Sequence, residues 1–339
     1  MREEYLGILG PADPLYTVLA SRAFPDITEP VFHVSRMYRD TVYKYTEEKT
    51  GQSLIGKFFD PTRNNLAERV LRVDEYDNLR AIRAFGFDAS PHVVVRPISR
   101  ERKIGLALIE EFIEGRDLDY YVKTAIYEGK GSYLEAKLAK LASFFFTLHR
   151  TTLRASYVDL EAQNEYFRKI LDTLCEENIV ATADRNRYLG MRDTWLEDHT
   201  MRLKRAGIVH GDPTPTNFIF TRDGDIVAID LERMKEADPV FDLGMVCAEI
   251  KHAFLWRTGN FYASEPYITH FFSHYASHSS HPSETFRKIT QRNPFYMALA
   301  EMRIARNRYL DVEYRKKLAH ESLQCLEHGL FLLQGPTGP

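Results

Sequence analysis

The stretch that decides the fold lies in the second half of the 339-residue chain. It reads Ile208-Val209-His210-Gly211-Asp212-Pro213-Thr214-Pro215-Thr216-Asn217-Phe218-Ile219-Phe220 and continues, after an Asp223-Gly224 turn, as Ile226-Val227-Ala228-Ile229-Asp230-Leu231-Glu232. Asp-Gly favours the tight turn that joins two antiparallel strands, and the apolar runs on both sides have the length of short strands. We therefore predict a β-hairpin that returns Asp230 to the side of Asn217.

Three polar residues of this stretch suit a metal-bound nucleotide held beside a hydroxyl group. Asp212 can accept or orient a hydroxyl proton, Asn217 can offer a neutral carbonyl oxygen to a cation, and Asp230 can bind the cation with full charge. The spacing Asp-x-x-x-x-Asn is that of kinase catalytic loops. The alternative is that Asp212 and Asn217 cap turns and Asp230 ends a strand, which explains each residue singly but not their combination.

The same residues resemble a known family. His210-Gly211-Asp212 with Asn217, then Ile229-Asp230-Leu231-Glu232 and Asp238-Pro239-Val240-Phe241-Asp242-Leu243, are similar to the motifs of the aminoglycoside phosphotransferase and choline kinase superfamily of small-molecule kinases. The resemblance implies ATP-dependent transfer of the γ-phosphoryl group to a hydroxyl of a small molecule. It also implies that Mg2+ binds to Asn217 and Asp230.

Roles for the remaining motif residues follow from the resemblance. Asp212 would be the catalytic residue, and His210 would orient its loop rather than act as a base. Asp242 would open a helix and brace the loop, and Glu232 is a weaker candidate for contact with a second metal or the acceptor.

The fold implied is α+β and protein-kinase-like, with two lobes and a cleft between them. Residues 1–113 would form a small nucleotide-binding lobe with an antiparallel sheet and one helix. Residues 114–333 would form a larger, mostly helical lobe that carries the catalytic and acceptor-binding residues, and residues 334–339, rich in Gly and Pro, would be a flexible tail.

A lysine upstream lies where the family needs one. Residues 31–45 and 52–59 predict strands around a polar turn, and Lys57 lies among apolar neighbours in the second of them. A lysine in such a place needs an anionic partner if it is buried. The resemblance assigns Lys57 to the ATP phosphates; the alternative is an outward-facing surface lysine.

A glutamate on the next helix could pair with this lysine. Helical periodicity runs from after Pro61 to about Phe85, and Glu75 precedes Leu79 by four positions on one face. Glu75 matches the spacing seen in the family, where a glutamate steadies the lysine against the phosphates. Glu68, seven positions earlier, is the competing candidate.

Two further features concern the nucleotide. Strands are expected near residues 92–98 and 106–113, and the main chain of Glu111, Phe112 and Ile113 would contact adenine. Residues 35–41 contain no glycine, so a glycine-rich phosphate loop is absent, and Arg36 or Arg39 could supply charge there instead.

The remainder of the chain reads as helices, some of which would line the acceptor pocket in the related family. Glu249 and Glu301 could attract a cationic acceptor, whereas Arg303, Arg306 and Arg308 could serve an anionic one; solvated helix faces are the plainer interpretation. The helices are expected at residues 133–150, 159–177, 184–205, 241–256, 265–277, 294–310 and 312–332.

A histidine series also needs weighing. His270, His274 and His278 recur at every fourth position, so a helix would align them on one face. Such a series could bind zinc or nickel, but no carboxylate or cysteine completes a known motif, and a solvated helix face is favoured.

Composition excludes several other classes. Lys plus Arg number 45 against 48 Asp plus Glu, so no charge excess favours nucleic acid or a membrane surface. Cys175, Cys247 and Cys325 are too few and too scattered for a disulfide framework, and no leader-like or membrane-length apolar run is seen, so a reduced cytoplasm is the simplest setting. The sequence leaves the oligomeric state open.

Two other interpretations remain. A nucleotide-binding pseudokinase or regulatory scaffold could keep the same fold, although such a protein would tolerate loss of Asp212. A protein kinase is disfavoured because His-Gly-Asp replaces His-Arg-Asp and an Ala-Pro-Glu segment is missing.

Overall fold

The computed structural model describes residues 3–37, 41–59, 66–202 and 205–334; the side chains of residues 66–74 and of Gln334 fall outside this description. Arg39 and residues 335–339 of the proposed tail 334–339 lie outside the described residues as well, whereas Gln334 is the last residue of a helix. The chain forms two compact units, Met1–Arg116 with Ile219–Arg233 and Asp117–Phe218 with Met234–Pro339. The hairpin segment 219–233, which the sequence interpretation placed in the second lobe, thus packs with the first unit.

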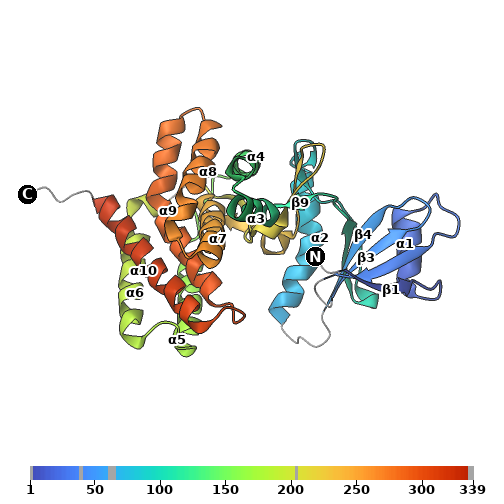
Figure 1. Ribbon diagram of the computed structural model, residues 1–339, viewed down its shortest axis with the longest axis horizontal. Helices are drawn as coiled ribbons and strands as arrows, with labels where there is room; N and C mark the ends of the chain where they lie inside the picture. Colours follow the sequence, from blue (N-terminus) through green and yellow to red (C-terminus); the bar gives the residue numbers. More distant parts are fainter. Residues whose placement is uncertain (1–2, 38–40, 60–65, 203–204, 335–339) are drawn as a thin grey trace, which may run out of the picture. The chain divides into compact units, whose positions relative to one another are not determined.

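The first unit is built on a six-stranded antiparallel sheet in the order β1-β2-β3-β4-β8-β7 (Figure 1). The predicted hairpin around Lys49-Thr50-Gly51 is confirmed as β3 and β4, with Val42 opposite Lys57. The strands are β1 (Glu4–Ile8), β2 (Phe32–Arg36), β3 (Val42–Glu47), β4 (Ser53–Phe58), β7 (Pro97–Glu101) and β8 (Leu106–Glu111).

The pleat of this sheet separates an apolar face from a polar one. Tyr45, Leu54 and Ile109 belong to the buried core that includes Leu15 and Leu19 of helix α1 (Pro14–Ala23). Successive side chains of a strand point to opposite faces. The neighbours of these residues along β3, β4 and β8 therefore face away from α1.

A second sheet has the order β5-β6-β12-β11-β9, and helix α2 (Leu66–Arg83) precedes it in the chain. Its neighbouring strands β11 and β12 are the predicted hairpin, which is confirmed. Asn78 of α2 donates a hydrogen bond to the Leu231 carbonyl at 2.9 Å, which ties this helix to the end of the hairpin segment. The strands are β5 (Asp88–Ala89), β6 (His92–Val94), β9 (Arg116–Asp117), β11 (Phe218–Phe220) and β12 (Ile226–Ala228).

The expected single strand at residues 92–98 is wrong. β6 pairs in parallel with β12, whereas β7 begins at Pro97 and pairs antiparallel with β8 in the other sheet. Proline has no amide hydrogen and is tolerated at the first residue of a strand, so the chain changes sheets there. The sequence run is continuous in hydrophobicity and hides the break.

The second unit is mainly helical, with a two-stranded sheet of β10 (Gly207–Val209) and β13 (Lys235–Ala237). Helices α7, α8, α9 and α10 are labelled in Figure 1. Among the described residues no helix is both long and apolar enough to cross a membrane. The helices are α3 (Leu118–Glu128), α4 (Gly131–Thr151), α5 (Leu160–Glu176), α6 (Thr182–Glu197), α7 (Val240–Thr258), α8 (Glu265–Ser277), α9 (Pro282–Ala305) and α10 (Val312–Gln334). Short 3-10 turns are η1 (Arg102–Ile104), η2 (His199–Met201), η3 (Pro215–Asn217), η4 (Leu231–Arg233) and η5 (Phe261–Ser264).

Three helix expectations need correction. α9 begins at Pro282 and contains Pro294 in its interior, whereas the sequence predicts a helix that begins at Pro294, since proline suits a first turn. Helix α6 ends at Glu197, before the expected residue 205, and η2 follows it. Helices α1 and α3 were not predicted, although Leu118, Val122 and Ala125 of α3 recur at helical spacing and are buried.

Close packing of α7 on α9 depends on Gly244. A Cβ atom at this position would lie 2.6 Å from Tyr296 Cβ and 2.9 Å from the Met297 amide nitrogen, so backbone atoms of α9 occupy the space. A Cβ at Gly190 in α6 would meet nothing within 4 Å.

We predict opposite effects for two chemically identical changes. Gly244→Ala should lower the free energy of unfolding by about 2 kcal/mol, because α9 must move away from α7. Gly190→Ala should raise it by about 0.5 kcal/mol, because alanine favours the helix. Urea denaturation monitored by circular dichroism measures both, and equal effects for the two variants would contradict the packing described.

Candidate functional site

The candidate residues form two groups, one within each unit. In the first unit the central residue is Lys57 of β4, on the polar face of the six-stranded sheet. Its Nζ lies 2.6 Å from Glu75 Oε1, 3.2 Å from Glu110 Oε1 and 3.8 Å from Asp230 Oδ1. Helix α2, strand β8 and the segment after β12 each supply one of these carboxylates.

The group is largely closed to water. The Lys57 side chain is 14% exposed, and those of Glu75 and Glu110 are 1% and 4% exposed. Burial alone would lower the pKa of Lys57, but the carboxylates of Glu110, Glu75 and Asp230 outweigh it and raise this pKa well above its ordinary value. Burial raises the pKa of Glu75 to about 8 against the attraction of Lys57, and it raises the pKa of Glu110 for the same reason.

The predicted partner of Lys57 is present, since Lys57 donates a hydrogen bond to Glu75. The side chain of the competing Glu68 lies outside the description. Glu110 was not predicted to belong here. It stands opposite Ile55 in the β4–β8 register, so its side chain reaches Lys57 diagonally across the sheet, and only the register could have revealed it.

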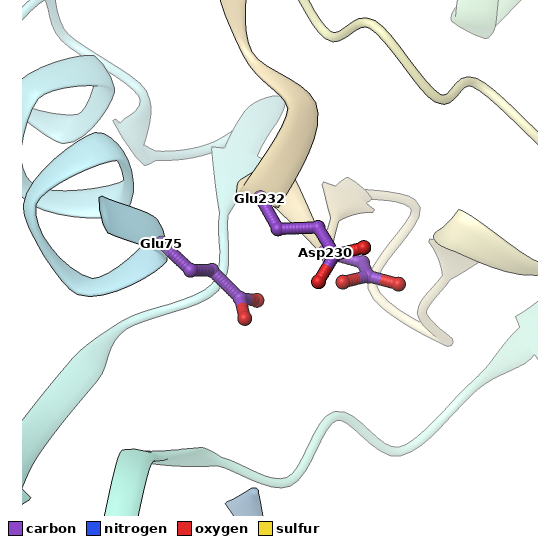
Figure 2. A group of neighbouring side chains, drawn as sticks. All are labelled: Glu75, Asp230 and Glu232. Carbon is purple, nitrogen blue, oxygen red and sulfur yellow. The ribbon is translucent and has the colours of Figure 1, made fainter. Parts of the chain in front are cut away.

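A cation could bind beside this lysine. Oxygen atoms of Glu75, Asp230 and Glu232 all lie within 4.8 Å of one another, and Figure 2 shows the three carboxylates converging. Asp230 adopts φ 64°, a left-handed conformation that aspartate tolerates better than most residues and that directs the chain out of β12. Carboxylate oxygens are the donors that Mg2+ prefers, so the residues fit this ion.

The adenine-contact segment expected from the sequence follows β8. The amides of Glu111 and Phe112 donate to the carbonyls of Arg96 and Ser53, both at 3.1 Å. Among the described hydrogen bonds, none uses the amide of Ile113. Lys44 stands over the Phe112 ring at 4.5 Å, on the same polar face as Lys57.

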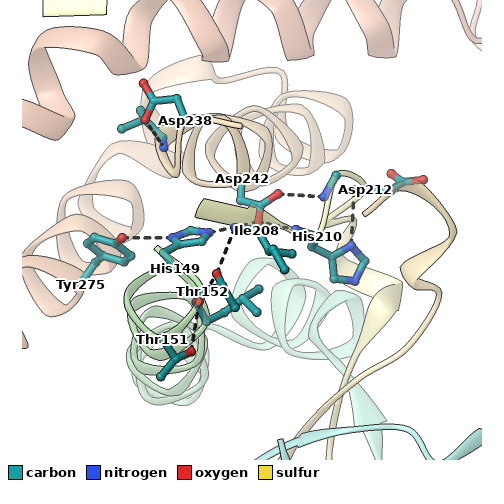
Figure 3. A network of polar contacts seen from close by, with 12 residues as sticks. His149, Thr151, Thr152, Ile208, His210, Asp212, Asp238, Asp242 and Tyr275 are labelled. Carbon is teal, nitrogen blue, oxygen red and sulfur yellow. Dashed lines mark hydrogen bonds and ion pairs between the residues drawn. The ribbon is translucent and has the colours of Figure 1, made fainter. Parts of the chain in front are cut away.

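In the second unit, the buried carboxylate of Asp242 holds the His-Gly-Asp loop (Figure 3). The amide of His210 donates to Asp242 Oδ2 at 2.7 Å, and the amide of Gly211 donates to Oδ1 at 3.0 Å. Gly211 has φ 81°, which favours glycine and lets two successive amides face one carboxylate. Asp242 is fully buried in the first turn of α7, where it accepts these two hydrogen bonds; its structural role stays a prediction.

Two histidines complete the support of this loop. His149 of α4 lies 3.2 Å from Asp242 Oδ2 and 3.0 Å from the Tyr275 hydroxyl. His210 is buried against the Phe218 ring, and its Nδ1 accepts a hydrogen bond from the Asp212 amide at 3.3 Å. His149 was missed in the sequence because it lies 93 positions from Asp242 and has no motif of its own.

Asp212 forms an ion pair with Arg303 of α9. The side chains of Asp212 and Arg303 are 17% and 15% exposed. Asn217 is buried, and its Nδ2 donates to the Asp212 carbonyl at 2.9 Å. This bond uses the amide nitrogen of Asn217 and leaves its oxygen as the atom suited to a cation.

The charged residues proposed to contact an acceptor have different partners in the structure. Arg303 contacts Asp212, as described. Glu249 lies on α7, where burial raises its pKa to about 7; the Arg303 guanidinium lowers this pKa and the Asp212 carboxylate raises it. Glu301 is buried and lies 3.0 Å from Lys251, and Arg308 lies 2.6 Å from Glu177. Both residues therefore form ion pairs within the second unit.

His270 and His274 lie on α8, whereas His278 follows the last residue of that helix. The rings of His270 and His274 lie 4.3 Å apart, and His270 Nε2 lies 3.0 Å from the Glu135 carbonyl oxygen. Among the described residues, the only group of three or more possible ligand atoms close enough to share a metal ion is the carboxylate set of Figure 2. The solvated helix face remains the preferred interpretation of the histidines.

Comparison with known proteins assigns the family. Residues 34–266 match the model of the phosphotransferase enzyme family, which is well over half of the chain. The chain belongs to this family. The match includes Lys57, Glu75, the His-Gly-Asp loop and Asp242, and extends far beyond the motif run at residues 208–243. A sequence search among curated proteins found no match.

Solved structures show the same fold. An ethanolamine kinase from Plasmodium vivax aligns with a TM-score of 0.58 at 12% identity, covering 94% of this chain and 89% of that one. The choline kinase LicA from Streptococcus pneumoniae gives 0.53 at 18% identity over 96% and 94%. The ADP-bound aminoglycoside phosphotransferase APH(2'')-Ib gives 0.54 at 16% identity over 94% and 100%. The predicted two-lobed fold, with an antiparallel sheet in the first part and a mostly helical remainder, is confirmed.

We predict that removing the lysine of this phosphotransferase destabilises it in a pH-dependent way. Lys57→Met leaves Glu75 and Glu110 buried without their cation, so the free energy of unfolding at pH 8 should fall by about 3 kcal/mol. A carboxyl whose folded pKa is raised stabilises the fold below its unfolded pKa and loses this contribution as pH rises through the folded value. The deficit should therefore be smaller at pH 5 than at pH 8.

Urea denaturation of both proteins at the two pH values measures this difference. Lys130→Met removes an exposed lysine that pairs with Glu128 at 2.7 Å, and should change stability little at either pH. The double variant with Glu75→Gln should recover part of the deficit. An equal deficit at pH 5 and pH 8 would show that Lys57 does not neutralise these carboxylates.

Proposed function

We propose that this protein is an ATP-dependent small-molecule kinase that transfers the γ-phosphoryl group to a hydroxyl of its acceptor. The observation that carries this proposal is the buried Lys57, held by Glu75 and lying 3.8 Å from Asp230. A lysine paired with a helix glutamate and close to a metal-binding aspartate is the arrangement that kinases use for nucleotide phosphates.

Each group then has a chemical role. Lys57 would contact the phosphates, and the main chain of residues 111–113 would contact adenine, with Arg39 as a further candidate for the phosphates. Asn217 and Asp230 would hold Mg2+, with Glu232 as an additional oxygen donor. When bound, Mg2+ would supply neutralisation of charge on the transferring phosphoryl group.

Asp212 would act on the acceptor. It would orient the hydroxyl and accept its proton while a bond forms between the hydroxyl oxygen and the γ-phosphorus; the bond from this phosphorus to the β-phosphate oxygen breaks, and ADP leaves. Because phosphoryl transfer has a loose transition state, positioning supplies most of the acceleration. The two amide bonds from the loop to Asp242 support that positioning.

Similar proteins support the choice of nucleotide. One aminoglycoside phosphotransferase structure is described as ADP-bound, and another as a ternary complex of streptomycin, ATP and APH(2'')-IIa. By analogy we propose ATP for this chain. The names of the similar proteins also mention aminoglycosides, ethanolamine and choline, so we propose as the acceptor an alcohol that also carries an amino or quaternary ammonium group.

An acceptor screen tests the proposed activity directly. Arg303 and Glu249 bring both signs of charge near Asp212, so the panel should include cationic, neutral and anionic alcohols: amino sugars, sugars, choline-like alcohols and hydroxy acids. ADP release above the background rate identifies an acceptor. Binding of Mg-ATP without turnover on any member of the panel would favour a nucleotide-binding scaffold of the same fold.

We predict that Asp212→Asn abolishes transfer and leaves nucleotide binding intact. The amide keeps the size of the side chain but cannot accept the hydroxyl proton, so kcat should fall by about 100-fold or more. Calorimetry with Mg-ATP should give an unchanged Kd. Asp223→Asn, in the exposed β11–β12 turn, is the matched control, and near-normal turnover of Asp212→Asn would refute the role of Asp212.

We also predict that Asp230→Ala uncouples nucleotide binding from magnesium. In the unchanged protein, the affinity for ATP should rise when EDTA is replaced by Mg2+, because Asp230 supplies a charged oxygen ligand. In Asp230→Ala this gain should shrink by about tenfold. Titration calorimetry in the two buffers measures the gain, and an unaltered gain would exclude Asp230 as a metal ligand.

A further inference from the structure

Glu110 carries a hydrogen-bonding atom without a partner. Its side chain is 4% exposed, and its Oε1 lies 3.2 Å from Lys57 Nζ. Its second oxygen, Oε2, is buried and has no hydrogen-bond partner among the described residues. A buried acceptor left without a donor costs about 1–3 kcal/mol, so a ligand that supplies a donor at Oε2 would be favoured there.

The position of Glu110 on its strand indicates which ligand this is. Ile109 packs into the core against α1, so the next residue, Glu110, faces the opposite side of the sheet, where Lys57 lies. Residue 111 begins the segment proposed to contact the base through its main chain. Glu110 therefore stands between the group proposed for the phosphates and the segment proposed for the base.

The two common purine triphosphates differ at the edge that such a residue would meet. Adenine carries an amino group on carbon 6, which is a hydrogen-bond donor, whereas guanine carries an oxygen there, which is an acceptor. A carboxylate oxygen accepts hydrogen bonds from the first and repels the second. Lys57 lies beside Oε1, so Oε2 is the oxygen that is left to accept such a hydrogen bond.

We infer that Glu110 accepts a hydrogen bond from the 6-amino group of the base and thereby selects ATP over GTP. This inference rests on the proposed function, because it assumes that a nucleotide binds with its phosphates at Lys57. It adds a residue that determines nucleotide specificity and that no sequence motif indicated.

A purely structural role for Glu110 makes a different prediction. If Glu110 only helps to hold Lys57, its replacement alters the contact with the phosphates, which are identical in ATP and GTP. Both affinities would then change by the same factor. The ratio of the two affinities isolates recognition of the base.

The experiment compares non-hydrolysable analogues of ATP, GTP and inosine triphosphate by calorimetry, with Mg2+, the full chain and no acceptor. Inosine has the 6-oxygen of guanine but lacks its 2-amino group. It therefore separates the effect of the 6-oxygen from a steric clash of the 2-amino group. The unchanged protein should bind the ATP analogue about tenfold or more tightly than the other two. In Glu110→Gln the preference should fall below about threefold, because the amide can rotate to donate to the 6-oxygen.

The control is Glu48→Gln, which removes an exposed carboxylate that pairs with His33 at 2.9 Å in the same unit, and it should keep the full preference. Thermal unfolding confirms that each variant is folded. Equal binding of all three analogues by the unchanged protein, or an equal loss for all three in Glu110→Gln, overturns the inference and leaves the proposed kinase function standing. Failure of the unchanged protein to bind any of them would overturn both.

Discussion

One cation shared by three carboxylates, in a place nearly closed to water, is the interaction on which the first unit depends. Lys57, Glu75, Glu110 and Asp230 come from four separate segments, and their separations of 2.6 to 3.8 Å require the sheet, the helix and the hairpin to meet correctly. Lys57 is paired with protein carboxyl groups, and Asp230, whose side chain is 26% exposed, is the most accessible of them. A polyphosphate that brings a divalent cation can be bound through that cation by Asp230, which is why this arrangement suits a metal-bound nucleotide.

In the second unit the central buried charge is an anion rather than a cation. Here a single buried anion, Asp242, receives two loop amides and lies against His149. A carboxylate with several backbone donors is well satisfied in a low-dielectric interior, and here two directional hydrogen bonds fix the backbone of the loop. Asp212 is carried on that loop and paired with Arg303, so its orientation is set from both sides.

Local sequence patterns predicted much of this arrangement, but they could not predict which distant residues pair. The β11–β12 hairpin followed from an Asp-Gly turn between apolar runs, and the Lys57–Glu75 pair followed from helical spacing together with the family resemblance. The contact of Glu110 with Lys57 and that of Arg303 with Asp212 were not predicted from the sequence. Glu110 reaches Lys57 only because of the β4–β8 register, and Arg303 reaches Asp212 across 91 positions, on a helix whose start was placed twelve residues too late. Periodicity reports which face a residue occupies, but not which distant residue it meets.

The interrupted course of the chain has a consequence for biosynthesis. The first unit consists of Met1–Arg116 and Ile219–Arg233, with the whole span between them belonging to the second unit. Its smaller sheet takes β11 and β12 from the later segment, and Asp230 lies at the end of that segment. The ribosome must therefore translate past residue 233 before the first unit can fold completely. Until then the smaller sheet lacks β11 and β12, and its strand edges stay unpaired while the helices of the second unit are synthesised. Synthesis of the first unit therefore begins first, but its folding is completed only after the second unit's first segment has been translated.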